Sequence, residues 1–133
     1  MAELIIIRSW TREQKIAYRV LRLIYKIIAQ NAAERNNESV LCTYYFKTLM
    51  LWACEERPEE FWAEHSLVHS IQQLLIEMAE WLTSKFCCNY FIRDNNMMDH
   101  LVDTDVSRDV DILYKMSASR NIIARVATLC AVD

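Results

Sequence analysis

Apolar residues recur every three or four positions along much of this chain, which is the period of an amphipathic α-helix. The clearest stretch runs from about Thr11 to about Asn31. Its apolar face comprises Ile16, Ala17, Val20, Leu21, Leu23, Ile24, Ile27 and Ile28. Thr11 and Gln14 have the T-x-x-Q spacing of a capping box, which predicts where this helix begins. A face this wide predicts a helix packed on a core.

The same pattern continues after the polar break at residues 31–39. Ser39 is placed to cap a second helix, which should end before Pro58 because the residue preceding a proline disfavours the helical conformation. Further helices are predicted over about 66–85, 96–116 (with a break) and 119–130. Residues 86–96 are aromatic and then polar, which predicts a packed crossover. The last buried edge should comprise Ile122, Ile123, Val126 and Leu129.

Composition strengthens the helical interpretation. The 133 residues include no glycine and one proline. Sheets need tight turns with positive φ angles, which glycine adopts at least cost, so a sheet-rich fold is disfavoured. We therefore predict an all-α bundle of five to six helices that forms a single domain over residues 1–133.

Cysteine usage bears on the compartment. The chain has five cysteines, an odd number, and its opening apolar run is too short for a secretory leader or a membrane span. Free thiols are the norm in reducing compartments. The sequence thus predicts a cytoplasmic protein, with the nucleus as the alternative, that does not contact a membrane.

Charge is distributed unevenly along the chain. The net charge is −3, yet residues 1–30 carry only two acidic residues among a row of six basic ones. The basic row comprises Arg8, Arg12, Lys15, Arg19, Arg22 and Lys26. At 100° per residue these positions fall within roughly 80° of the helix, opposite its apolar face. The row has two interpretations, a solvated helix face and a surface that neutralises phosphate.

Other chemistry-bearing residues are better explained by structural roles. The triplets Asp103-Thr-Asp105 and Asp109-Val-Asp111 lie at a predicted helix start and in a helix body, where positions i and i+2 diverge too far to share an ion. His65 and His69 have zinc-compatible spacing but no evident third ligand. We therefore predict no catalytic residue, no metal site and no cofactor in this chain.

Two stretches together resemble a known family. Residues 44–62, YYFKTLMLWACEERPEEFW, resemble the segment that follows an S-Y-x-x-K-T signature in cyclic GMP–AMP synthase and its relatives. Residues 89–101, NYFIRDNNMMDHL, resemble their N/H-Y-F-I-P-x-x-N-L element. Both elements belong to the male-abnormal-twenty-one-like (Mab-like) family, and the resemblance covers about residues 9–102.

The resemblance implies a helical C-terminal lobe without the catalytic N-terminal lobe. Family members hold their Gly-Ser motif and metal-binding carboxylates on that other lobe, so this chain is expected not to catalyse nucleotidyl transfer alone. Mg²⁺ is implied only where the catalytic lobe is present. Thr43 and Tyr44 match the signature pair that binds phosphate and stacks on a base, and Arg22 matches a phosphate-binding lysine. Arg19 and Lys15 resemble basic positions that contact double-stranded nucleic acid.

These matches lead to two alternative functions. In the first, the chain is the nucleotide-contacting lobe of an innate-immune type of sensor, with Arg12, Lys15, Arg19 and Lys26 against a nucleic-acid duplex. Residues 8–16 contain no Cys or His, so the zinc-binding insertion of the vertebrate synthase is not expected, and Arg93 replaces the proline of the Y-F-I-P element. In the second, the chain is a stand-alone interaction module. It would then form a homodimer or bind a partner lobe through exposed apolar residues such as Leu4, Ile5, Ile6 and Ile7.

Overall fold

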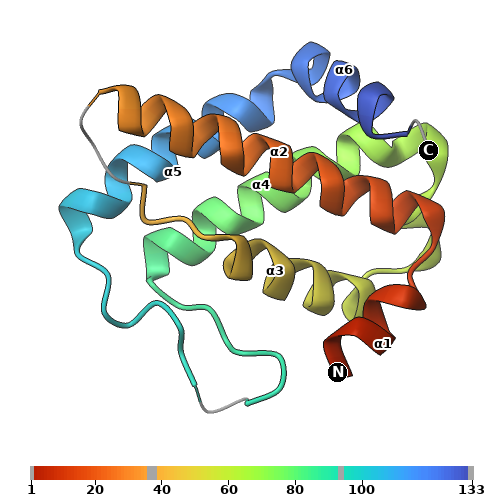
Figure 1. Cartoon of the computed structure of the whole chain (residues 1–133), viewed down its shortest axis with the longest axis horizontal. Helices are drawn as coiled ribbons and strands as arrows, with labels where there is room; N and C mark the ends of the chain where they lie inside the picture. The colour runs from red at the N-terminus through yellow and green to blue at the C-terminus, as the bar shows by residue number, and fades with distance from the viewer. Residues whose placement is uncertain (1, 36–38, 93–94, 132–133) are drawn as a thin grey trace.

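The all-α bundle predicted from the sequence is confirmed. The computed structural model describes residues 2–35, 39–92 and 95–131 (Figure 1). Within these residues the chain forms six α-helices and two short 3-10 helices. They are α1 (Ala2–Arg8), α2 (Arg12–Glu34), α3 (Thr43–Glu56), η1 (Glu59–Trp62), η2 (Glu64–Ser66), α4 (Leu67–Ser84), α5 (Asp103–Ala118) and α6 (Arg120–Cys130). No described helix has the length and apolar character needed to cross a lipid bilayer.

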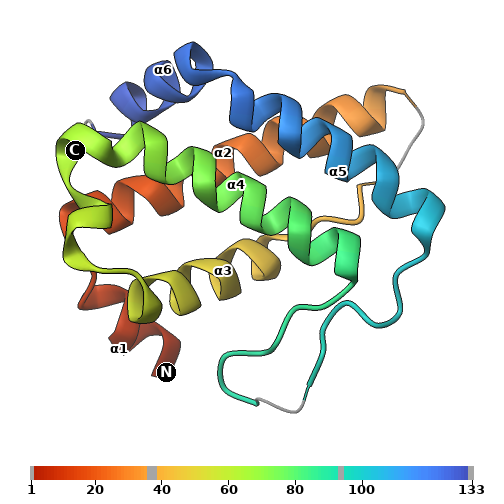
Figure 2. The ribbon, with the colours of Figure 1, turned by 180° about the vertical axis from the view of Figure 1, so that it is seen from behind.

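Helix α4 is the centre of the bundle. It packs against α2 and α3 on one side and against α5 and α6 on the other, as the two opposite views show (Figures 1 and 2). Its buried residues are Leu67, Ser70, Ile71, Leu74, Leu75, Met78, Ala79 and Leu82. Burying a large aliphatic side chain contributes about 1.5–3 kcal/mol, so this helix holds the bundle together.

Helix α2 begins as the sequence predicts and extends three residues beyond the expected end at Asn31. The Gln14 amide donates to Thr11 Oγ1 at 3.2 Å, and the Thr11 amide donates to Gln14 Oε1 at 2.8 Å. This reciprocal capping box satisfies two amides that lack partners within the helix. Arg8 lies outside α2, at the end of the separate helix α1.

The prediction that Ser39 caps the second helix is wrong. Helix α3 begins at Thr43, and its N-cap is Cys42. Ser39 instead donates its hydroxyl to Asp109 Oδ2 at 2.8 Å, and the same oxygen accepts the amides of Val40 at 2.7 Å and Leu41 at 3.3 Å. A carboxylate from α5 therefore holds residues 39–41 in place, and the helix starts only after them.

The predicted buried edge of α6 is only partly correct. Ile123 is fully buried and Val126 packs against the core. Ile122, however, is 45% exposed and Leu129 is 70% exposed. Helix α6 lies on the outside of the bundle against α2, α4 and α5, so only one of its sides is covered (Figures 1 and 2).

Candidate nucleotide and nucleic-acid interface

The basic row divides between two helices. Arg8 closes α1, and the other five basic residues lie along α2 on the side opposite its buried residues. Lys15 is half-buried, whereas Arg12, Arg19, Arg22 and Lys26 are exposed. Among the residues that the structure describes, Lys15, Arg22 and Lys26 form no ion pair.

Two of the five α2 residues contact the end of α6. Arg12 Nη2 donates to the carbonyl oxygen of Ala131 at 3.1 Å, and Arg19 Nη1 donates to that of Cys130 at 3.0 Å. The last carbonyls of a helix lack intrahelical donors and carry partial negative charge, so cations stabilise them. Burial raises the pKa of the Cys130 thiol, and the nearby Arg19 opposes this rise. Arg12 and Arg19 thus act as caps for α6.

Arg22 points to the side of α2 that faces α3. Its guanidinium carbon lies 5.6 Å from the centre of the Tyr18 ring. Tyr25, two turns after Tyr18 on the same side, packs against Phe46 of α3 with ring centres 6.1 Å apart. Arg22 therefore lies at the α3 edge of the basic row, and Arg12 and Arg19 lie toward its α6 edge.

Thr43 and Tyr44 form the first turn of α3, and both side chains are exposed. The N-cap residue Cys42 makes no side-chain hydrogen bond to this turn, and the turn contains no acidic residue. Lys47, one turn later, places its Nζ 6.0 Å from the centre of the Tyr44 ring. Helix N-termini attract anions through their amide groups and dipole. A hydroxyl, an aromatic ring and a lysine thus meet at one anion-favouring helix end.

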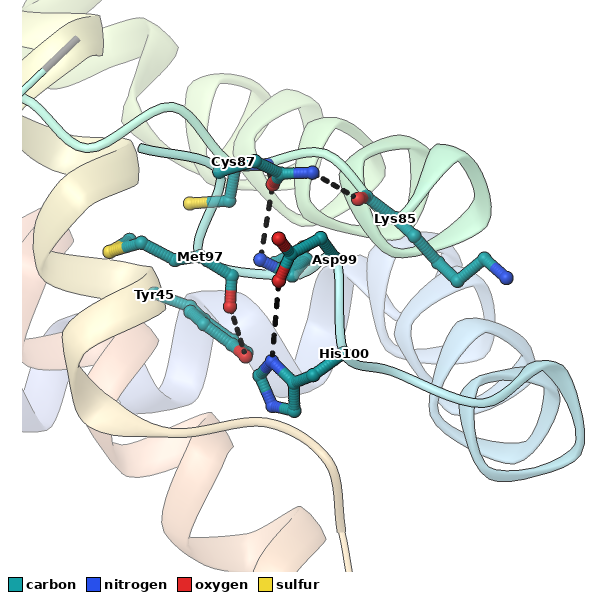
Figure 3. A network of polar contacts seen from close by, with 8 residues as sticks. Tyr45, Lys85, Cys87, Met97, Asp99 and His100 are labelled. Atoms are coloured by element: carbon teal, nitrogen blue, oxygen red, sulfur yellow. Dashed lines mark hydrogen bonds and ion pairs between the residues drawn. The ribbon is translucent and has the colours of Figure 1, made fainter. Parts of the chain in front are cut away.

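Tyr45, the neighbour of Tyr44, points inward and holds the crossover between α4 and α5. Its hydroxyl donates to the carbonyl oxygen of Met97 at 3.2 Å (Figure 3). Burial, reinforced by nearby Cys42 and Cys87, raises the pKa of Tyr45 to about 12. Tyr45 is therefore a neutral structural residue, and it fixes the base of α3 from which Tyr44 projects.

Asn96 organises the same crossover. Its Oδ1 accepts the amides of Cys87 at 2.8 Å and Met98 at 3.1 Å, and its Nδ2 donates to the Lys85 carbonyl oxygen at 2.9 Å. Lys85 ends α4 in the left-handed conformation, with φ at 52°. This network, drawn in Figure 3, joins residues 85–87 to 96–98, whereas Phe86, Phe91 and Ile92 are exposed, so the crossover expected for residues 86–96 is only partly packed where it is described. Arg93 and the side chain of Asp105 lie outside the described residues.

The remaining candidate groups have structural settings. Asp109 is buried and bound to residues 39–41, and Asp111 pairs with Lys115 at 2.9 Å. The two carboxylates of this D-x-D triplet thus point in different directions, as a helix requires. Burial raises the pKa of the Cys87 thiol, with Cys42 and Cys88 adding to the effect, to about 12. Across the described part of the chain, no three His, Cys, Asp or Glu side chains are grouped to hold a metal.

The fold and surface define an all-α domain whose basic helix α2 lies beside an exposed Thr-Tyr pair. Comparison with protein-family models matches residues 13–114 to the Mab-21 protein HhH/H2TH-like domain. The chain therefore belongs to the Mab-21 C-terminal domain family, as its sequence motifs indicated. The match runs from α2 to most of α5 and extends beyond residue 102, where the motif resemblance ends. No solved structure matched the chain.

Sequence reasoning missed the buried carboxylate of Asp109. Val106, Val110 and Leu113 form the core-facing row of α5, and Asp109 occupies the i+3 position of that row. An acidic residue on an apolar face predicts a buried hydrogen-bonded carboxylate, because an unpaired buried charge is too costly. This periodicity is the signal that identifies Asp109 as structural.

Proposed function

We propose that this chain is the nucleotide- and nucleic-acid-contacting helical lobe of a cyclic GMP–AMP synthase-like member of its family, and that it is not catalytic alone. The first turn of α3 is the observation that carries the proposal. Thr43 offers a hydroxyl to phosphate there, and the exposed ring of Tyr44 offers a face for a base. Stacking on an aromatic side chain contributes ~1–3 kcal/mol per base.

Arg22 supplies the matching charge from α2. Its guanidinium lies on the α3-facing side of that helix, near Tyr18, and forms no ion pair among the described residues. Arginine binds phosphate oxygens with two parallel N–H donors. Thr43, Tyr44 and Arg22 together form the proposed nucleotide site.

The remaining basic residues of α2 would contact a duplex. Lys26 lies fourteen residues after Arg12, which is about 21 Å along the helix. This length is close to that of six base pairs of duplex. Lys15 and Lys26 are the principal phosphate contacts in this proposal. Arg12 and Arg19 each donate one N–H group to a carbonyl oxygen at the end of α6. A guanidinium has five N–H donors, so the others can still bind phosphate.

Catalysis is assigned to a separate nucleotidyltransferase lobe, together with its Mg²⁺. The buried carboxylate of Asp109 binds its own chain, and Asp111 pairs with Lys115, so this D-x-D triplet serves the fold. The role we propose for the assembled protein is that of a cytoplasmic sensor of the innate-immune type.

The experiment compares Arg22→Glu with Arg125→Glu, a control of equal charge change at an exposed position on α6. Binding of duplex DNA, duplex RNA and GTP is measured by fluorescence anisotropy or calorimetry from 50 to 200 mM salt. We expect Arg22→Glu to weaken GTP binding about tenfold and to reduce its salt slope by about one, because one phosphate contact is lost. Arg125→Glu should change affinity less than about twofold. Equal, unchanged binding by both variants to all three ligands would rule out the proposal.

A second candidate, a protein-interaction module, is supported by exposed apolar residues. Ile5 on α1 is 68% exposed and Leu129 on α6 is 70% exposed. Ile6 and Ile7 pack against the core instead, and the side chain of Leu4 lies outside the described residues. Light scattering separates the two functions. A tight dimer that Ile5→Ser dissociates and that ignores duplexes favours the module, whereas a monomer with salt-dependent duplex binding favours the lobe.

A further inference from the structure

A groove between α3 and α4 combines aromatic rings with carboxylates. Helix α3 carries Trp52 and Glu56 one turn apart, and α4 carries Glu77 and Trp81 with the same spacing. The two helices run in opposite directions (Figures 1 and 2), so the tryptophans share one end of the groove and the glutamates the other. Phe86 and Cys88 complete a lining that encloses about 290 Å³.

The Trp52 wall of the groove is fixed by a hydrogen bond and by ring packing. Trp52 Nε1 donates to the Cys88 carbonyl oxygen at 2.8 Å, and the Trp52 ring meets Tyr90 edge-on with centres 5.0 Å apart. The Phe86 amide donates to the Trp81 carbonyl oxygen at 3.0 Å, while the Phe86 ring stays 54% exposed. A wall that is already ordered, as Trp52 is, needs little rearrangement to bind a ligand, which favours affinity.

The carboxylate end of the groove is negative. Glu77 pairs with Arg57 at 3.0 Å. Glu56 is exposed and has no ion-pair partner among the described residues. Arg57 also lies over the Phe61 ring, 5.0 Å from its centre. At the edge of this groove, an arginine of the chain itself thus pairs with a carboxylate and also lies over an aromatic ring.

We propose that this groove binds the guanidinium group of an arginine side chain presented by a partner protein. The guanidinium would stack on Trp81 and Phe86 and pair with the carboxylate of Glu56. Aromatic faces attract cations through the ring quadrupole, and carboxylates repel the phosphates that the basic row of α2 would attract. The space of about 290 Å³ between the lining residues has room for one planar side chain.

Arginine fits this chemistry better than lysine. Its planar guanidinium stacks on aromatic faces and also binds a carboxylate through two parallel N–H donors, whereas an ammonium group is compact and strongly hydrated. The groove and the proposed nucleotide site attract ligands of opposite charge. A partner bound here would therefore leave the basic helix free, and the two proposals can fail separately.

The experiment uses the indole N–H resonances of the four tryptophans in a ¹⁵N-labelled protein. The probe is an acetylated, amidated Gly-Ser-Arg-Ser-Gly peptide, and its matched control replaces arginine with uncharged citrulline. We expect the arginine peptide to shift Trp52 and Trp81 with saturation, while Trp10 and Trp62, which are buried elsewhere, stay in place. The citrulline peptide should bind at least about fivefold more weakly.

Three variants, one of them a control, locate the cation contact. Glu56→Gln should weaken arginine-peptide binding about fivefold, and Glu55→Gln, a neighbouring exposed position outside the groove, should leave it unchanged. Trp81→Leu should also weaken binding, with circular dichroism confirming that the helices remain. Equal binding of the arginine and citrulline peptides, or equal effects of the two glutamate variants, would overturn the proposal. A lysine peptide that binds as tightly would overturn the assignment to arginine.

Discussion

At the scale of single residues, Asp109 carries more of the fold than its motif suggests. The D-x-D spacing is one that metal ligands can have, yet the Asp109 side chain is 3% exposed and belongs to the core-facing row of α5. Its Oδ2 accepts three donors from residues 39–41. A buried carboxylate needs such partners, and the polar segment before α3 needs an acceptor. One residue thereby sets the position at which α3 begins.

Replacing Asp109 with alanine should therefore destabilise the protein by about 2–4 kcal/mol, because buried donors lose their acceptor. Asp111→Ala is the matched control. The Asp111 carboxylate is exposed and pairs with Lys115 on the surface. Its removal should therefore lower the free energy of unfolding by less than about 1 kcal/mol. Urea denaturation followed by circular dichroism measures both free energies of unfolding. Equal losses in the two variants would show that the hydrogen bonds of Asp109 contribute little.

At the scale of helices, the sequence predicts which residues share a face but not which neighbour covers it. The apolar period located α2 and α4, and the capping box at Thr11 fixed the start of α2. The start of α3 was misplaced, because a serine before an apolar run resembles a cap whenever its true acceptor lies seventy residues away. The same limit applies to the basic row. Its alignment is visible in the sequence, whereas its contact with α6 depends on tertiary packing.

The hydrogen bond from Arg19 to α6 predicts that variants of Arg19 and Lys26 affect α6 differently. Arg19→Gln should loosen the last turn of α6, because the Cys130 carbonyl loses a charged donor worth about 1 kcal/mol. Hydrogen–deuterium exchange at residues 126–130 should then become about fivefold faster. Lys26→Gln removes the same charge from the same helix and should leave that exchange unchanged. Unaltered exchange in Arg19→Gln would mean that the arginine is available to ligands alone.

At the scale of the whole molecule, the basic row and an acidic cluster lie on different elements. Five residues of the basic row lie along α2, and five glutamates lie between the end of α3 and η2: Glu55, Glu56, Glu59, Glu60 and Glu64. The net charge of −3 conceals this division. The groove is lined by residues that the proposed nucleotide site does not include, so we expect the two surfaces to act independently.

That independence predicts how variants of one surface affect the other. Glu56→Gln should change duplex affinity less than about twofold at 150 mM salt, since Glu56 lines the groove and the duplex is proposed to lie along α2. Arg22→Glu should likewise leave the affinity for the arginine peptide within about twofold, and the double variant should show the sum of the two separate effects. Anisotropy with the duplex and indole shifts with the peptide measure these affinities. Removing a carboxylate that repels phosphate can strengthen duplex binding only where the phosphates come close to it. If Glu56→Gln strengthens duplex binding severalfold, the duplex therefore reaches the groove, and the two ligands compete for one extended surface.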